Sequence, residues 1–305
     1  SNSDRGTYDL SNINANFFDV DADYRQWDSY LSLLGNASLD NYRDNKLSRY
    51  SEYKNYIHTA DVMLRVIKKD YNFNVGVQVV PQKSHFVQDY QSVHTDTTRT
   101  VTNVTPTADF RWKISKLSQL RFTYRGNTSQ PSMTDLLDIT DDSNPLNVKK
   151  GNPGLKPSFT QNFRLFYNNY IQNHQRSIMA HLMFSTTDNS ISNMVTYDKT
   201  TGGRTTRPEN INGNWNAFGM FMFNTAIDTA AYFNVNTFTT VNYSNSVGYV
   251  SVDKADSQKS TTRTTNLSER IAASYRNDWL EFELNGSLSY MHARSKLQAN
   301  NNLDT

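Results

Sequence analysis

Apolar and polar residues alternate along much of this chain, which is typical of β-strands with one apolar and one polar face. The stretch YNFNVGVQV places its apolar side chains on one face: Tyr71, Phe73, Val75, Val77 and Val79. The stretches WLEFELNGSLSY and LRFTYRG do the same with Leu280, Phe282, Leu284, Leu288 and Tyr290, and with Leu120, Phe122 and Tyr124. Weaker alternation marks residues 163–167, 178–184, 218–222 and 233–243. We therefore predict an all-β fold, an antiparallel up-and-down meander.

The connections between these strands alternate between short and long. The short ones fall at residues 68–72, 115–119, 169–175, 224–230 and 276–278, and the long ones at residues 81–103, 127–158, 186–214 and 245–266. Bacterial outer-membrane barrels have short periplasmic turns and long extracellular loops. The architecture of a β-sandwich does not require short and long connections to alternate in this way. The pattern predicts about ten antiparallel strands of a transmembrane β-barrel over residues 53–305.

Aromatic residues lie close to every predicted short turn. They are Tyr71, Trp112, Tyr167, Tyr170, Tyr232, Tyr275 and Trp279. Tyr and Trp are also common at strand ends in general, but combined with the alternating connections they favour one interfacial girdle of a membrane barrel. In such a barrel the apolar faces contact lipid and the polar faces, with Arg121, Arg125, Glu281 and Glu283, line a wet interior.

Composition narrows the class of protein further. The formal net charge is only +2, so no electrostatic bias indicates a nucleic-acid partner. Cysteine is absent, which excludes disulfides and thiolate metal sites. The chain contains no run of eighteen or more apolar residues, so we expect no transmembrane helix.

The alternation of apolar and polar residues is weaker in the first 52 residues. We assign residues 1–52 to an N-terminal segment of the barrel, without assigning its secondary structure. The opening SNSDRG has neither a basic region nor an apolar run of a signal peptide, so we expect a segment of a longer protein. Tyr24, Trp27, Leu31 and Leu34 have helical spacing, with Gly35 as a candidate C-terminal cap. A helix and a strand both remain open for this stretch.

Candidate catalytic chemistry is sparse, and we expect no enzyme, no cofactor and no metal. The six histidines show no spacing typical of metal ligands: His58, His85, His94, His174, His181 and His292. Asp138, Asp141 and Asp142 could bind Ca²⁺ through carboxylate oxygens, but they lack the spacing of an EF-hand, and a solvated loop is the better interpretation. The turn-rich stretch YDKTTGGRTTRPEN is interpreted as a surface loop.

The segment NPLNVKKGNPGLKP, residues 144–157, contains three of the seven prolines of the chain. Pro153 and Pro157 fix their own φ angles and bias the preceding residues towards extended geometry. Gly151 and Gly154 permit turns that other residues resist. We interpret the segment as a rigid lead into the next strand.

The block from Gln130 to Tyr167 resembles a hallmark segment of the outer-membrane β-barrel family of TonB-dependent receptors. The positions that carry the resemblance are Pro131, Ser132, Leu136, Asp142, Ser143, Asn144, Pro145, Leu146, Gly151, Asn152, Pro153, Leu155, Lys156 and Pro157. Two further blocks, LSRYSEYKNYIHTADVMLRVIKKDYNFNVGVQV and RPENINGNW, are similar to other parts of the same family and follow in the same order. We take Asn144, Pro145, Gly151, Asn152, Pro153, Leu155 and Pro157 as structural motif residues.

The resemblance implies a receptor for energy-coupled nutrient uptake in the outer membrane of a Gram-negative cell. Family members close a large barrel with an N-terminal plug that contacts the TonB system. No plug segment is apparent in this chain, and the expected terminal aromatic strand is absent from NNNLDT. We therefore expect a partial barrel of a large receptor, without its plug, whose strand edges could pair with a second copy.

The ligand is not specified by the sequence, because iron chelates, glycans, peptides and vitamins all fit an uptake receptor. A second hypothesis comes from a different class of protein. A soluble all-β module could bind a ligand such as a glycan, with Tyr and Trp stacking on sugar rings.

Overall fold

The computed structural model describes residues 2–6, 8, 42–44, 48–90, 93–137, 140–141, 144–172, 175–251, 255–295 and 303–304. The stretch with helical spacing around Trp27 lies outside the described residues, as do Asp138, Asp142 and His174. Among the described residues, no helix is long and apolar enough to span a membrane.

The chain divides into two compact units. The first contains residues 1–58 and 80–102, and the second contains residues 59–79 and 103–305. Two long strands, β4 (Tyr71–Tyr90) and β5 (Val93–Ser115), contribute residues to both units.

In the first unit, β1 (Asn2–Arg5) pairs with β2 (Arg49–Ile57), and β2 pairs with the second half of β4. The prediction of a long loop over residues 81–103 is wrong, because the strands continue through most of this segment. Residues 82–90 pair with β2 and alternate in burial, so that Ser84, Phe86 and Gln88 are buried. Polarity alone therefore did not distinguish an extended hairpin from a loop.

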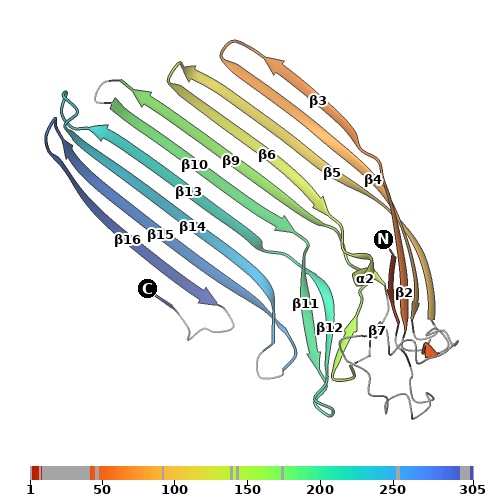
Figure 1. The fold of residues 1–305 in the computed structure, drawn as a ribbon. Coiled ribbons are helices and arrows are strands. Elements are labelled where there is room, and N and C mark those ends of the chain that lie inside the picture. Colours follow the sequence, from red (N-terminus) through yellow and green to blue (C-terminus); the bar gives the residue numbers. More distant parts are fainter. Residues whose placement is uncertain are drawn as a thin grey trace, which may run out of the picture. The chain divides into compact units, whose positions relative to one another are not determined.

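The second unit contains an antiparallel meander, drawn from orange to blue in Figure 1. It consists of β3 (Ala60–Ile67), the first part of β4, the last part of β5, β6 (Ser118–Ser129), β9 (Ser158–Ile171), β10 (Arg176–Asp188), β13 (Asn214–Ala226), β14 (Phe233–Val250), β15 (Gln258–Arg276), β16 (Glu281–Ser295) and β17 (Leu303–Asp304). Apart from the connections that contain other strands, sequence neighbours are also neighbours in the sheet. The predicted all-β antiparallel meander is confirmed.

Short turns join the strands at one end of this sheet, and each is closed by hydrogen bonds. Lys68 N–H donates to the carbonyl oxygen of Tyr71 over 2.9 Å, and Asn277 N–H donates to that of Leu280 over 2.9 Å. In the turn between β13 and β14, the Asp228 carboxylate accepts from Tyr232 N–H at 3.1 Å and from Phe233 N–H at 2.8 Å. These side chain-to-backbone bonds explain why Asp and Asn occupy the turns.

Two long connections at the other end of the strands build a small sheet of their own. Its order is β11-β12-β8-β7, with β7 (Thr140–Asp141), β8 (Asn147–Lys150), β11 (Ser190–Tyr197) and β12 (Arg204–Ile211). The short helix α2 (Met133–Leu136) precedes β7, and the Ser132 hydroxyl caps it by accepting from Asp135 N–H at 3.1 Å. The predicted long segment 245–266 is shorter than expected, because β14 extends to Val250 and β15 begins at Gln258.

Candidate functional site

One face of the sheet in the second unit is apolar and open. Between β15 and β16, Tyr275 lies opposite Phe282 and Ala273 opposite Leu284. Phe282, Leu284 and Leu288 are 60%, 63% and 67% exposed. Apolar side chains that remain uncovered over so many neighbouring strands require an apolar phase or a partner.

The height of this apolar face fits the hydrocarbon core of an outer membrane. On β15 it runs from Tyr275 to Leu267, eight positions apart, which is about 27 Å along the strand. These nine residues fall within the roughly 9–11 residues that a tilted transmembrane strand needs to cross the hydrocarbon core. At a tilt of about 40° they span roughly 21 Å, slightly less than the apolar band of about 25 Å on outer-membrane barrels. Beyond Leu267 the same face turns polar with Arg263 and Arg294, which lie opposite each other.

The aromatic residues predicted to form a girdle lie at the ends of the strands, beside the short turns. Tyr275 contacts Phe233 with ring centroids 4.6 Å apart and Tyr232 at 6.4 Å. Asn277 Nδ2 donates to the Tyr275 hydroxyl over 2.9 Å, and Trp279 is 82% exposed. Rings with an apolar body and a polar tip suit the boundary between hydrocarbon and water.

A second row of aromatic rings crosses the apolar face between β6 and β14, and the alternation in the sequence did not predict it. The neighbouring centroids are 4.9, 6.1, 5.9 and 5.1 Å apart along the row Tyr124, Phe163, Phe184, Trp215 and Tyr243. These residues are far apart in the chain, and only the register of β6, β9, β10, β13 and β14 brings them together. Several of these rings line an apolar groove of about 490 Å³, together with Ala217 and Gly219.

One carboxyl group interrupts the apolar face. Glu269 lies between Leu267 and Ile271 on β15, directly opposite Thr239 of β14. The Thr239 hydroxyl donates a hydrogen bond to the Glu269 carboxyl group. This bond supplies the polar partner that a carboxyl group needs in an apolar environment.

The opposite face of the same strands is polar and carries a group of arginines. We call Arg111, Arg121, Arg125 and Arg164 the arginine cluster. Arg121 donates through Nε and Nη2 to one oxygen of Asp109, at 3.0 and 2.8 Å, and the Thr123 hydroxyl donates to the same oxygen at 3.0 Å. The predicted polar-face residues Arg121 and Arg125 both line one cleft, whereas Glu283 lines a second cleft with Arg270.

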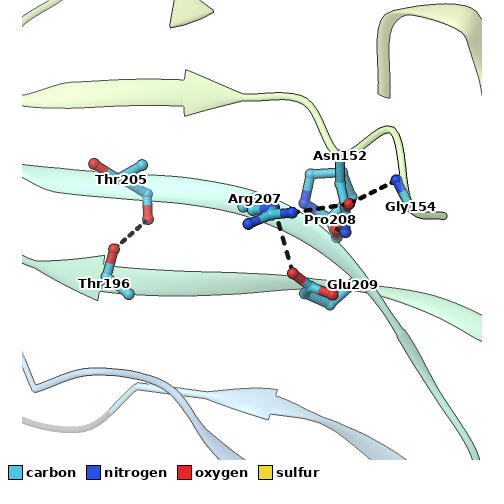
Figure 2. Close-up of polar contacts among 7 residues, drawn as sticks. All are labelled: Asn152, Gly154, Thr196, Thr205, Arg207, Pro208 and Glu209. Atoms are coloured by element: carbon cyan, nitrogen blue, oxygen red, sulfur yellow. Dashed lines mark hydrogen bonds and ion pairs between the residues drawn. The ribbon is translucent and has the colours of Figure 1, made fainter. Parts of the chain in front are cut away.

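The two long connections are locked together by a set of contacts that we call the loop clamp: Gly151, Asn152, Lys156, Arg207, Pro208 and Asn210. Asn152 Nδ2 donates to the Pro208 carbonyl oxygen at 2.9 Å, and Asn152 Oδ1 accepts from Gly154 N–H at 3.0 Å and from Arg207 Nη2 at 2.9 Å (Figure 2). Arg207 Nε lies 3.4 Å from Glu209 Oε1, an ion pair without hydrogen-bond geometry. The buried Asn152 therefore uses both ends of its amide to hold β12.

A second asparagine repeats this arrangement from the other connection. Asn210 Oδ1 accepts from Lys156 N–H at 2.7 Å, and Asn210 Nδ2 donates to the Lys156 carbonyl oxygen at 3.0 Å. Gly151 fits because there is no room for a side chain: a Cβ atom would lie 1.7 Å from the Leu137 carbonyl oxygen. The clamp thus depends on backbone contacts that only particular residues permit.

The structure places the remaining motif residues around this clamp. Asn144 Oδ1 accepts from Leu146 N–H at 3.1 Å, and the Asn144 carbonyl oxygen accepts from Asn147 N–H at 2.8 Å, which forms the turn before β8 around Pro145. Leu155 is 5% exposed. Pro153 and Pro157 lie on either side of Leu155, and Pro157 directly precedes β9.

No group of three or more His, Cys, Asp or Glu residues suited to a metal ion occurs in the described part of the chain. The predicted calcium candidates cannot be compared as a set, because Asp138 and Asp142 lie outside that part. The described histidines take other places: His181, for example, contacts the Phe166 ring edge-on at 6.2 Å.

Comparison with known proteins connects this arrangement with a family. Residues 11–303 match the model of an outer membrane protein beta-barrel family. No curated protein matches the chain. Among solved structures, the siderophore receptor PirA from Acinetobacter baumannii is similar at 9% identity and a TM-score of 0.36, with 82% of this chain and 49% of that chain covered. The chain therefore spans about half the length of that receptor.

The family match supports the membrane interpretation over that of a soluble module. It covers nearly all of the sequence, including both units and the loop clamp. Its barrel members reside in the outer membrane, where the exposed apolar face described above has a lipid phase to contact. The chain belongs to the outer membrane protein beta-barrel family and is located in the outer membrane.

Proposed function

We propose that this chain forms part of the barrel wall of a TonB-dependent receptor that takes up a nutrient, and that it performs no catalysis. The observation that carries the proposal is the loop clamp. Two of the sequence blocks that resemble TonB-dependent receptors, around Gly151 and around Pro208, contact each other through Asn152 and Asn210. The resemblance thus concerns residues that act together in space, and not only residues in the same order.

The proposed role divides the surfaces of the second unit among three partners. The apolar face contacts outer-membrane lipid, the polar face lines the passage, and the clamped long connections present the surface that first meets the nutrient. Energy comes from the TonB system through a plug segment of the whole protein. No nucleic acid is involved, and pairing of free strand edges with a second copy remains a further proposal for the chain in isolation.

A soluble module would have to bury its apolar face under a second layer of polypeptide. In the described residues of the second unit, Phe282, Leu284 and Leu288 remain well exposed. The clamp also holds together connections that a compact binding module would not need to make so long. These features favour the uptake receptor.

The test is an uptake assay with cells that produce the whole outer-membrane protein carrying this chain. A defined mixture of ferric siderophores, cobalamin, oligosaccharides and peptides is supplied, and the depletion of each compound is measured by mass spectrometry. We expect at least one compound to be depleted only when the gene, TonB and the proton gradient are all present. Equal depletion in cells without TonB, with the protein folded in the outer membrane, would contradict the proposal.

A further inference from the structure

The arginine cluster on the polar face concentrates positive charge on three neighbouring strands. Arg111 of β5 lies directly opposite Arg121 of β6. Arg125 lies opposite Asn162 of β9, and Arg164 lies opposite Thr123, so that Arg125 and Arg164 are diagonal neighbours. Like charges at such positions repel each other, and the repulsion lowers the stability of the sheet unless an anion compensates it.

The sheet itself supplies too little negative charge for this compensation. On the polar face of the described strands from β5 to β14, Asp109 is the one carboxylate, and it is engaged by Arg121 and Thr123. Within the described part of the chain, the side chains of Arg125 and Arg164 have neither a hydrogen bond nor an ion pair. Two guanidinium groups therefore remain available to a ligand, beside a third that Asp109 holds in place.

The space in front of these arginines has the size of a ligand site. A cleft of about 510 Å³ is lined by Arg121, Thr123, Arg125, Asn162, Arg164, Phe166 and His181. Sites for small molecules commonly have volumes of 300–1,000 Å³, with a few convergent polar groups on an apolar base. Here Phe166 and His181, in edge-on contact, supply an aromatic base, and Asn162 and Thr123 supply neutral hydrogen-bonding groups.

We propose that this cleft binds a solute with at least two carboxylate or phosphate groups. The planar guanidinium fork binds carboxylate and phosphate oxygens through paired hydrogen bonds, and two unpaired forks on neighbouring strands suit a multivalent anion. The inference rests on the proposed function and narrows its substrate class to polyanions. The cleft lies three to seven positions from the short turn before β6, near the middle of β6, β9 and β10 and apart from the loop clamp. The cleft is therefore a binding site along the passage and not part of the surface that the nutrient contacts first.

The test measures anion binding to the whole outer-membrane protein, purified in detergent. Citrate and tripolyphosphate serve as the two probes in titration calorimetry, which distinguishes a carboxylate from a phosphate ligand. The variant carries both Arg125→Gln and Arg164→Gln, and the control is Arg270→Gln, an arginine on the same face that lines a different cleft. Heat-dependent gel migration shows whether each variant is folded.

We expect one or both probes to bind the unmodified protein, with Kd raised at least about tenfold in the double variant and unchanged in Arg270→Gln. Equal weakening in both variants would indicate diffuse electrostatic attraction and overturn the proposal. Absence of binding to the unmodified protein would also overturn it and would point to an acidic polypeptide segment as the occupant.

Binding in detergent requires neither TonB nor a proton gradient, so the two proposals can fail separately. A protein that binds tripolyphosphate through Arg125 and Arg164 but does not transport would contradict only the uptake function. TonB-dependent uptake that is insensitive to the double substitution, together with unchanged Kd, would contradict only the anion site.

Discussion

The membrane-facing sheet and the loop clamp belong to the same unit but are specified in different ways. In β13 to β16, alternating side chains define two faces, and many substitutions that keep the alternation would keep the strands. In the clamp, Asn152 holds β12 and Gly151 fits against Leu137 through contacts that depend on single atoms. Many residues share the task of defining the faces of the sheet, so a single substitution there removes little of the pattern. The clamp depends on a few residues, so the two regions should respond differently to mutation.

The strongest test of the two-faced sheet places a charge on each face in turn. Leu284→Arg, on the apolar face two positions inside the Tyr275 girdle, should reduce the free energy of unfolding in phospholipid vesicles by about 2–3 kcal/mol, because the cost of a lipid-facing arginine falls from the bilayer midplane towards the interface. Asn285→Arg, on the polar face beside Glu283, should change it by only about 0.5 kcal/mol. Equal losses in guanidinium unfolding would show that the two faces have been assigned wrongly.

The comparison of the two regions can be sharpened with a matched pair of glycines. Gly151→Ala forces a Cβ atom against the Leu137 carbonyl oxygen and should destabilise the clamp by about 2–3 kcal/mol. Gly286→Ala in β16 has no heavy atom within 4 Å of the new Cβ and should be close to neutral. Hydrogen exchange of the β12 amides measures the first effect, and fast exchange in both variants would refute the distinction.

A smaller effect is expected when the clamp loses hydrogen bonds without a steric clash. Asn152→Ala leaves the Pro208 carbonyl oxygen and Gly154 N–H without their side-chain partner, at a cost of about 2 kcal/mol. Asn152→Asp keeps an oxygen for Gly154 and Arg207 but loses the donor to Pro208, so about half of this loss is expected. If Asn152→Asp proved as damaging as Asn152→Ala in the same exchange measurement, the acceptor role of Asn152 would be negligible.

The smallest expected effect concerns acid pH at the turn between β13 and β14. Hydrogen bonds from the N–H groups of Phe233 and then Tyr232 hold the pKa of the Asp228 carboxylate below its ordinary value of 3.8. A lowered folded-state pKa stabilises the turn above pH 3.8, and this stabilisation is lost as the pH falls through the folded-state value.

Asp228→Asn removes this titration, so its difference in unfolding midpoint from the unmodified protein should be present at pH 7 and shrink below pH 3.8. Asp198, whose pKa is lowered first by the N–H of Thr200 and then by the Thr201 hydroxyl, provides the same test in the β11–β12 turn. A difference independent of pH would contradict the role of the carboxylate charge.

The sequence was sufficient to predict the strands of the sheet, because their information is local. Residues 71–79 and 120–124 alternate strictly, and residues 280–290 alternate apart from Gly286; all lie within strands except Leu280, just before β16. The prediction of a long loop over residues 81–103 was wrong for a physical reason. Its residues 82–90 pair with β2, and this pairing partner lies more than twenty positions away in the chain.

The motif residues illustrate what a sequence reveals only in part. Prolines and glycines around Gly151 indicated a rigid segment, but not that Asn152 would reach Pro208, 56 positions further on. The aromatic row ending at Tyr243 and the arginine cluster likewise depend on register between strands. A sequence lists such residues, but the pairing of strands decides which of them are neighbours.

The bond between Thr239 and Glu269 constrains the order in which this protein can assemble. An extended β15 that met the acyl chains alone would bring in a carboxyl group without a donor, which the bilayer interior strongly disfavours. The β14 and β15 strands should therefore pair at the membrane surface and insert into the bilayer together as a hairpin. Thr239→Val is expected to slow folding into vesicles, and an unchanged rate would show that the hairpin need not form first.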